Sequence, residues 1–310
     1  MARGMKRHAD PVDGLLLLNK PSGMTSNRAL QVVRRLINAQ KAGHTGSLDP
    51  AATGMLPLCF GEATKVCAYL LDADKSYRVT AKLGSATDTG DADGQESETA
   101  SVPELSADGW NEILQGFCGE STQIPPMYSA LKKDGKRLYE LARKGETVER
   151  APRPIRIDSI ELLELAGSRL VFRVSCSKGT YIRVLVEDIA RKVGTVAHTA
   201  RLHRETVGDF ASAKMLDMAA LEALAEQGLE PLRAELLPAD VALGRMPEVT
   251  ISEEDALRFC GGQAVKADVA GQAGLARVYS AGKRFLGVGE LAAEGMLAPR
   301  RVFQTQEKTP

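Results

Sequence analysis

The sequence predicts a fold that mixes helices and strands and ends in a smaller, β-rich region. Segments of strict two-residue alternation occur between segments in which apolar residues recur at helical spacing. The helical pattern stops around residues 236–247, and only short β-like segments follow it. Because a chain of 310 residues is long enough for two domains, we place a domain boundary near residue 247.

The first elements are a buried strand and an amphipathic helix. Residues 14–18 begin an apolar run that a proline turn closes at Pro21, which is typical of a buried strand. Ser26 is placed to cap a helix with apolar residues at helical spacing, namely Leu30, Val33, Leu36 and Ile37. Further along the chain, helical character is expected from Ala63 to Leu71.

The later elements follow the same two periodicities. Residues 76–83 alternate strictly and place their apolar side chains, Tyr77 among them, on one face of a strand. Residues 87–94 form a turn-rich acidic loop. A second alternating strand, a short amphipathic helix and two β-like segments are expected at 170–176, 185–193, 276–279 and 285–291.

Composition indicates a globular protein of a reducing compartment. Hydrophobic residues make up 44% of the chain and charged residues 26%, as in ordinary globular domains. We find no apolar stretch of membrane-spanning length, and the basic N-terminus lacks the apolar core of a signal peptide. The five cysteines are odd in number and widely spaced, which favours neither a disulfide framework nor a metal site. We expect a cytoplasmic protein.

The charges are unevenly distributed, although the formal net charge is zero. Residues 1–41 contain eight Lys and Arg against two acids, and residues 132–156 contain nine against four. Either basic run alone is compatible with a solvated face. Two such runs on a neutral chain are what a protein with one RNA-facing side would show.

The loop at residues 43–54 has the clearest functional pattern. Its sequence, GHTGSLDPAATG, places one carboxylate, Asp49, between glycines and five residues after His44. A structural alternative is that Asp49 caps a helix starting at Pro50, since both residue types are favoured there. The longer run GHTGSLDPAATGMLPLCFGEATK resembles the catalytic loop of the pseudouridine synthases, and a match of this length is more specific than a short motif.

The chain resembles the TruB family of pseudouridine synthases, the bacterial branch that acts on uridine 55 of tRNA, almost from end to end. Three further blocks show the resemblance: KSYRV at 75–79, QIPPMYSALK at 123–132 and CSKGTYIR at 176–183. It implies an α+β catalytic domain over residues 10–246, with a mixed, largely antiparallel central sheet and an RNA-clamping insertion at about 124–156. It also implies a small, β-rich, PUA-like RNA-binding domain over residues 247–306.

The implied activity is isomerisation of one uridine in the T stem-loop of tRNA, in which uracil is detached, rotated and reattached through carbon 5. No cofactor, metal or guide RNA is implied, and we expect a monomer. Breaking a glycosidic bond needs a nucleophile or a fixed negative charge near the sugar carbon. Asp49 matches the family nucleophile. Attack on the sugar and promotion of 2′-proton loss both remain open.

The resemblance assigns two more catalytic residues. Arg183 matches the arginine that pairs with the nucleophile, and a guanidinium there would depress the pKa of Asp49. Tyr77 matches the tyrosine that stacks on the extruded base and helps to remove the proton at carbon 5, although alone it would be interpreted as a core aromatic. Asp91 matches an acid of the same network.

Substrate-binding roles come from the same resemblance. Tyr181 and Leu202 would line the base pocket, and Tyr181 would share a face with Arg183 if residues 180–183 are extended. His44 would fill the space that the flipped base leaves, although a lone histidine is more often a loop hydrogen-bonder. The basic residues assigned to RNA binding are Lys20, Lys132 and Arg137.

The chain departs from the family pattern at residues 202–205. The sequence there is LHRE, where the family usually has Leu-Arg-Arg, which weakens the expectation of a phosphate contact near residue 203. Three other functions remain as alternatives: an RNA-binding or tRNA-folding protein, a guide-RNA-dependent synthase, and a nucleoside hydrolase that releases uracil.

Overall fold

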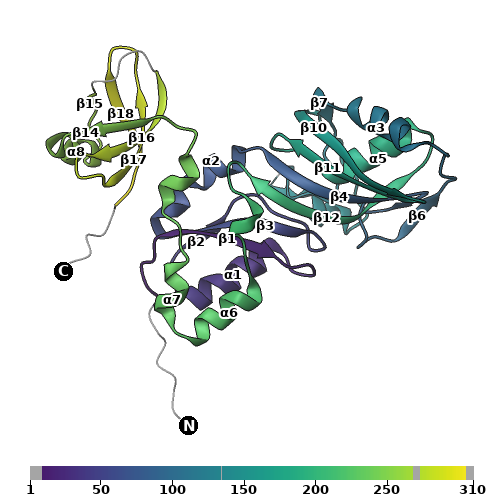
Figure 1. Cartoon of the computed structure of the whole chain (residues 1–310), viewed down its shortest axis with the longest axis horizontal. Helices are drawn as coiled ribbons and strands as arrows, with labels where there is room; N and C mark the ends of the chain where they lie inside the picture. Colours follow the sequence, from purple (N-terminus) through teal and green to yellow (C-terminus); the bar gives the residue numbers. More distant parts are fainter. Residues whose placement is uncertain (1–8, 134, 268–272, 305–310) are drawn as a thin grey trace, which may run out of the picture.

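The computed structural model describes residues 9–133, 135–267 and 273–304. Its central sheet has nine strands. They are β1 (Gly14–Lys20), β2 (Ala42–His44), β3 (Thr53–Phe60), β4 (Lys75–Leu83), β7 (Gly119–Gln123), β10 (Arg153–Ala166), β11 (Arg169–Cys176), β12 (Ala197–Val207) and β13 (Leu216–Asp217). The strand order is β13-β1-β3-β12-β4-β11-β10-β7, and β2 pairs with β3 (Figure 1).

The sheet is mixed and largely antiparallel, which confirms the expected α+β class. Only the pairs β1–β13 and β3–β12 are parallel among the described strands of this sheet. The tyrosine strand β4 lies between β11 and β12, and its burial alternates as expected, with Tyr77 on the buried side. Tyr77 therefore lies on an inner strand of the sheet.

Different helices cover the two halves of the sheet. The helices, including short 3-10 turns (η), are α1 (Ser26–Ile37), η1 (Gly61–Val66), α2 (Cys67–Asp72), α3 (Ala107–Gln115), α4 (Leu138–Ala142), α5 (Ile182–Lys192), η2 (Ser212–Lys214), α6 (Met218–Glu226), α7 (Leu229–Ala234), η3 (Ala239–Leu243) and α8 (Glu253–Cys260). Helices α1, α6 and α7 pack against β1 and β3, whereas α3 and α5 pack on the half formed by β4, β10 and β11 (Figure 1).

The expected cap of α1 is wrong, and so is the structural alternative for Asp49. Thr25, not Ser26, caps α1, because its hydroxyl accepts a hydrogen bond from the Arg28 N–H at 3.2 Å. The hydroxyl of Ser26 is instead buried and bonds both backbone groups of Leu48. No helix begins at Asp49, since residues 49–52 are irregular and lead into β3. The capping alternative for Asp49 therefore fails.

A separate β-rich domain ends the chain. Its sheet has the order β14-β16-β17-β18-β15 and is covered by α8. The strands are β14 (Glu248–Ile251), β15 (Val265–Lys266), β16 (Gly274–Ser280), β17 (Phe285–Leu291) and β18 (Met296–Val302). Val288 and Phe303 belong to the same apolar cluster as Leu15 and Leu17 of β1, so this domain packs on the first one. Residues 305 and 306 of the expected domain lie outside the described residues.

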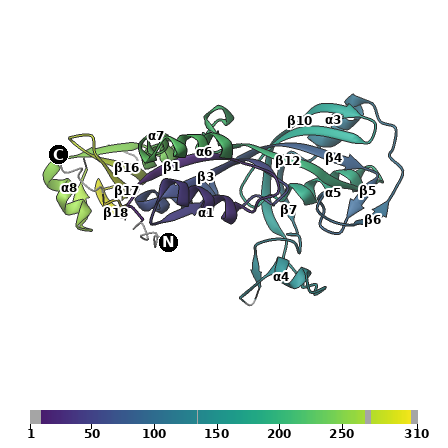
Figure 2. The same ribbon diagram turned by 90° about the horizontal axis from the view of Figure 1, so that it is seen from below.

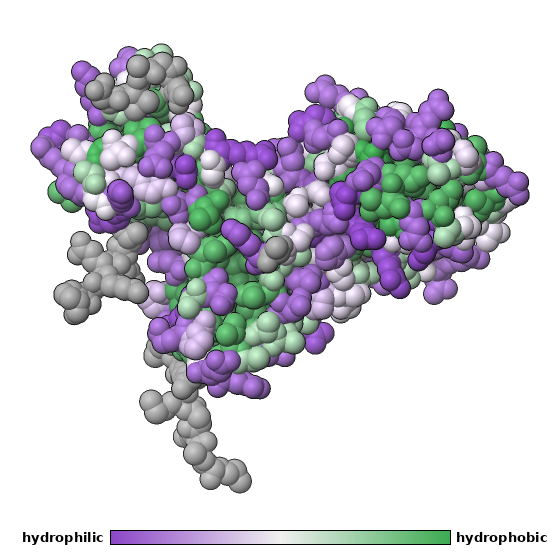
Figure 3. Space-filling view, viewed as in Figure 1, coloured by the Kyte–Doolittle hydropathy of each residue, from purple (hydrophilic) through white to green (hydrophobic). Residues whose placement is uncertain are grey.

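Two small hairpins extend from the body. They are formed by β5 (Ser85–Thr87) with β6 (Glu96–Thr99), and by β8 (Lys132–Lys133) with β9 (Lys136–Arg137). The second hairpin continues into α4, and together they project away from the sheet (Figure 2). In Figure 3, hydrophilic residues predominate on the visible face of the C-terminal domain, while hydrophobic residues gather over the two halves of the large sheet.

Within the described ranges, every helix is too short or too polar to cross a membrane.

Candidate active site

The catalytic candidate Asp49 lies in the loop between β2 and β3, and backbone contacts hold this loop from several sides. Ser26 of α1 makes reciprocal hydrogen bonds with Leu48, at 2.8 and 3.1 Å. The Thr45 N–H donates to the Pro57 carbonyl at 3.1 Å. The carboxylate of Asp49 is thereby carried on a fixed backbone while its side chain remains 43% exposed.

Lys20 supports the loop rather than facing outward. The residue is 0% exposed. Its ammonium donates to the carbonyls of Pro21, Met24 and Pro50, the last of which follows Asp49 directly. Burial lowers the pKa of Lys20 to about 8, and the nearby Asp49 charge opposes this shift. The expected RNA contact is therefore not available to Lys20 in this arrangement.

Arg183 brings the two acidic candidates together. Its Nε lies 3.0 Å from Oδ2 of Asp49 and 3.7 Å from Oδ2 of Asp91. The two other guanidinium nitrogens donate to the carbonyls of Thr89 and Tyr128, at 2.8 and 2.7 Å. A side chain bound on three sides and 7% exposed has little freedom to move. Arg183 therefore fixes the direction of the Asp49 carboxylate.

The environment raises the pKa of Asp49, which contradicts the expected depression. Loss of water around the carboxyl is the largest effect and raises the pKa. Arg183 and Lys20 lower it, while Asp91 raises it. Desolvation favours the neutral form of an acid, and one shared arginine does not offset it. The carboxyl consequently takes up a proton more readily than a free aspartate.

Tyr77 and Leu202 form the apolar side of the site. Tyr77 is 8% exposed and belongs to the same cluster as Leu48 and Ala52 of the loop, and Leu202 packs against this cluster. Burial raises the pKa of the Tyr77 phenol. The site thus combines a charged pair with an aromatic and aliphatic surface.

His44 lies at the start of the loop, whereas the backbone at Tyr181 does not have the expected extended conformation. His44 ends β2 at the start of the loop, and its buried Nδ1 has no hydrogen-bond partner among the described residues. Desolvation and the charge of Arg204 lower the pKa of His44. Residues 180–183 are not extended, because α5 begins at Ile182 and Tyr181 is its N-cap residue. The expected shared face with Arg183 is therefore wrong.

The basic insertion lies next to the site. Lys132 and Arg137 are exposed and face each other across the β8–β9 hairpin. A cleft of about 700 Å³ separates the insertion from α5, and Thr89 and Tyr128, whose carbonyls bind Arg183, both line it. Arg183 thus lies between Asp49 and a cleft that the insertion borders.

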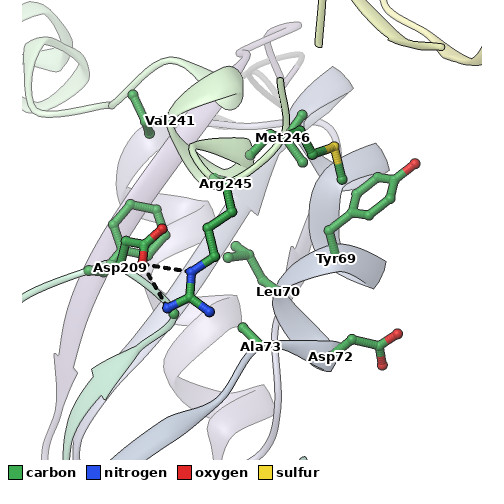
Figure 4. Close-up of a pocket in the computed structure, with 12 residues that line it drawn as sticks. Tyr69, Leu70, Asp72, Ala73, Asp209, Val241, Arg245 and Met246 are labelled. Carbon is green, nitrogen blue, oxygen red and sulfur yellow. Dashed lines mark hydrogen bonds and ion pairs between the residues drawn. The ribbon is translucent and has the colours of Figure 1, made fainter. Parts of the chain in front are cut away.

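A second, smaller pocket of about 210 Å³ is located elsewhere, between α2, the turn after β12 and the segment around η3 (Figure 4). Its apolar residues include Leu70 and Met246, and at one side Arg245 forms an ion pair with Asp209 at 2.9 Å. None of the residues assigned to the site from sequence lines it. In the described part of the chain, we find no cluster of three or more His, Cys, Asp or Glu side chains placed to hold a metal.

Gly54 allows β3 to approach β12 beside the site. Its φ is +101°, and a Cβ there would lie 2.3 Å from the carbonyl oxygen of Arg204. We expect Gly54→Ala to lower the free energy of unfolding by at least ~2 kcal/mol, because it combines backbone strain with a clash against backbone. Chemical denaturation measures this. Gly23→Ala is the control, since its φ is also positive but no atom lies within 4 Å of the added carbon; equal losses for both variants would contradict the clash.

Comparison with family models assigns most of the length of the chain to one family. The model "TruB family pseudouridylate synthase (N terminal domain)" matches residues 34–182. The models "tRNA pseudouridylate synthase B C-terminal domain" and "Pseudouridine synthase II TruB, C-terminal" match residues 183–244 and 247–303. The chain belongs to the TruB family of pseudouridine synthases. It is thereby a member of an isomerase family.

Curated relatives and solved structures agree with this assignment. Proteins named tRNA pseudouridine synthase B are 50% identical in Pseudomonas putida strain F1, over 97% of this chain and 99% of the relative, and 52% identical in Dechloromonas aromatica, over 96% and 98%. The crystal structure of a Cbf5-Nop10-Gar1 complex matches with a TM-score of 0.73 at 25% identity, covering 97% of this chain and 88% of that one. The archaeal box H/ACA sRNP Nop10-Cbf5 complex gives 0.71 at 25% identity, covering 97% and 89%.

Sequence reasoning missed one residue that this TruB-family site contains. Arg204 is 1% exposed and contacts the catalytic loop. The sequence does contain an indication of this. Leu202 and Arg204 are two residues apart in β12, so they lie on the same face of the strand. A charged residue at a position that the alternation assigns to the apolar face is the pattern that could have identified Arg204.

Proposed function

We propose that this protein isomerises uridine 55 in the T stem-loop of tRNA to pseudouridine, with Asp49 as nucleophile. The observation that carries the proposal is the 3.0 Å pairing of a half-exposed Asp49 with a buried Arg183 at the edge of an apolar surface containing Tyr77. The names of the curated relatives support tRNA as the substrate. Neither a guide RNA nor a cofactor is part of the proposal.

The chemistry requires the C1′–N1 bond of the uridine to break and a C1′–C5 bond to form, after which the proton at carbon 5 leaves. The ionised carboxylate of Asp49 begins this sequence, either by attacking the sugar or by promoting loss of the 2′ proton. Arg183 keeps the carboxylate aimed at the sugar. Tyr77 and Leu202 hold the uracil ring, and Tyr77 is the group next to carbon 5 that assists proton removal.

A base in a folded loop must leave its stack before it can react, at a cost of a few kcal/mol. The half-buried His44 at the start of the catalytic loop is the residue proposed to occupy the vacated space. Tyr181 completes the pocket for the flipped uracil, and Asp91 supports Arg183. The cleft beside α5 receives the adjoining RNA.

The RNA contacts outside the pocket are proposed for the insertion at about 124–156 and for the PUA-like domain at 247–306. Phosphate contacts position an RNA without specifying its sequence. The exposed cross-strand pair of Lys132 and Arg137 is suited to this role. We propose that a single copy of the chain is sufficient for binding.

Replacing Lys132 and Arg137 together by glutamine is expected to weaken tRNA binding and flatten its salt dependence, by about one unit of slope per lost phosphate contact. Filter binding over a salt series measures the slope. The matched control replaces Lys82 and Arg169, which also face each other across two strands but lie away from the insertion. An unchanged slope in the first variant would locate the clamp elsewhere.

The experiment that tests the proposed function is tritium release from tRNA labelled at uridine carbon 5, with purified protein and nothing else added. Release that disappears when uridine 55 alone is replaced by cytidine supports the proposal. Release that requires an added guide or protein would support a guide-dependent enzyme. Binding without release would support an RNA-folding protein.

A further inference from the structure

Arg204 lies behind the catalytic loop, buried beneath it in β12. It is 1% exposed, so its guanidinium is not presented to RNA. Nε donates to the Met55 carbonyl at 2.7 Å, and an Nη donates to the Gly46 carbonyl at 3.0 Å. One side chain therefore links the first part of the loop, at Gly46, to the strand that follows the loop.

The same residue is the cross-strand neighbour of Tyr77. Arg204 and Tyr77 are directly opposite in the antiparallel β4–β12 ladder, and opposite residues of such a pair project from the same face. Arg204 thus lies directly beside Tyr77 as well as behind the loop.

Burying a guanidinium costs free energy unless its N–H groups are hydrogen-bonded and its charge is compensated. Among the described residues, Arg204 forms no ion pair with a carboxylate, and its hydrogen-bond partners are the carbonyls of Met55 and Gly46. These two carbonyls lie on either side of Asp49 along the chain, and the cross-strand neighbour of Arg204 is Tyr77. Its charge also opposes the rise that burial imposes on the pKa of Tyr77.

We propose that Arg204 is a positioning residue for the isomerisation, which holds the Gly46 end of the catalytic loop and the side chain of Tyr77 in one fixed geometry. This inference rests on the proposed function. Arg204 does not touch the uridine; it acts through Tyr77 and through the backbone of the loop. The carboxylate and the phenol consequently approach the same uridine from fixed positions.

A double-mutant cycle tests the coupling. The single-turnover rate of tritium release and the tRNA Kd are measured for wild type, Tyr77→Phe, Arg204→Met and the double variant. We expect Arg204→Met to lower the rate at least ~30-fold while Kd changes less than about threefold. In the Tyr77→Phe background the same replacement should cost much less, because residues that act as a unit are not additive. Independent, multiplying losses would overturn the proposal.

Lys75→Met is the matched control. Lys75 is a second buried cation near Gly46, but its ammonium donates to the carbonyls of Leu71 and Ala73 and not to Tyr77 or the loop. Its effect on the rate should therefore be the same with and without the Tyr77 hydroxyl. Equal coupling to Tyr77 in both methionine variants would indicate a general effect of buried charge and would overturn the role of Arg204.

The titration of Tyr77 can be measured by spectroscopy even in variants whose activity is too low for a rate. With 13Cζ-tyrosine labelling, the resonance lost in Tyr77→Phe identifies Tyr77, and its titration should move to higher pH in Arg204→Met but not in Lys75→Met. An unmoved titration would contradict the inference. If Arg204→Met does not fold, Arg204→Gln, which also removes the charge, serves in both measurements. Wild type without tritium release would refute the proposed function itself, whereas an active wild type without coupling would refute only this inference.

Discussion

Asp49→Asn is expected to abolish turnover while tRNA affinity changes by less than about tenfold. The amide keeps the size of the side chain but removes the negative charge that the reaction needs at the sugar carbon. The loop itself should persist, because Ser26, Thr45 and Lys20 hold its backbone and none of these contacts uses the Asp49 side chain. Tritium release and filter binding of the same preparation measure both quantities.

The control for this variant is Asp158→Asn, the same change at an ion-paired carboxylate on the surface strand β10. Its tritium release should match wild type. Retained turnover in Asp49→Asn would remove Asp49 from the nucleophile role. A loss of RNA binding as large as the loss of turnover would indicate that the residue serves the fold or the complex instead.

Arg183→Met is expected to reduce the rate at pH 7 by at least ~100-fold. The variant loses the contact that aims the Asp49 carboxylate and leaves the carbonyls of Thr89 and Tyr128 without their donor. Lys192→Met is the control on the same helix, where the side chain is exposed and does not line the cleft. A similar loss in the control would point to disruption of α5.

The pH profile of the same variants checks the electrostatics. Because the pKa of Asp49 is raised above its usual value of 3.8, the acid limb of the wild-type rate should lie above that pH. Arg183 lowers the pKa of Asp49, so removing it raises the pKa further, and the limb should move to higher pH in Arg183→Met. Arg183→Lys retains the charge and should shift the limb less. A limb that does not move would show that another group titrates.

Two parts of the site could be predicted from the sequence. The loop around Asp49 was recognisable because a packed core does not require a carboxylate between glycines. The alternation of residues 76–83 placed Tyr77 on the buried face correctly. The start of α5 was expected three residues too late, although the apolar residues Ile182, Leu185 and Val186 already show helical spacing.

Other features depend on three-dimensional surroundings that a linear pattern does not contain. Thr25 and Ser26 are both favoured N-cap residue types, and only the position of Leu48 determines that Ser26 faces the loop. A partner for Asp49 could be named from sequence, but the amount of water removed around its carboxyl could not, so the direction of the pKa shift was missed. Lys20 was assigned to RNA binding from the resemblance, and its burial likewise depends on surroundings that the sequence does not contain.

The pairing order of the central sheet has a consequence for biosynthesis. Strand β4 lies between β11 and β12, which follow it by roughly a hundred residues, and Arg204 bonds Met55 across a sequence separation of 149. Contacts this distant form only after the intervening chain has been translated. A nascent chain that has not yet exposed residue 204 therefore lacks one of the two cross-strand neighbours of Tyr77 and also the support of Gly46. The enzyme should gain activity late and all at once during synthesis, not progressively.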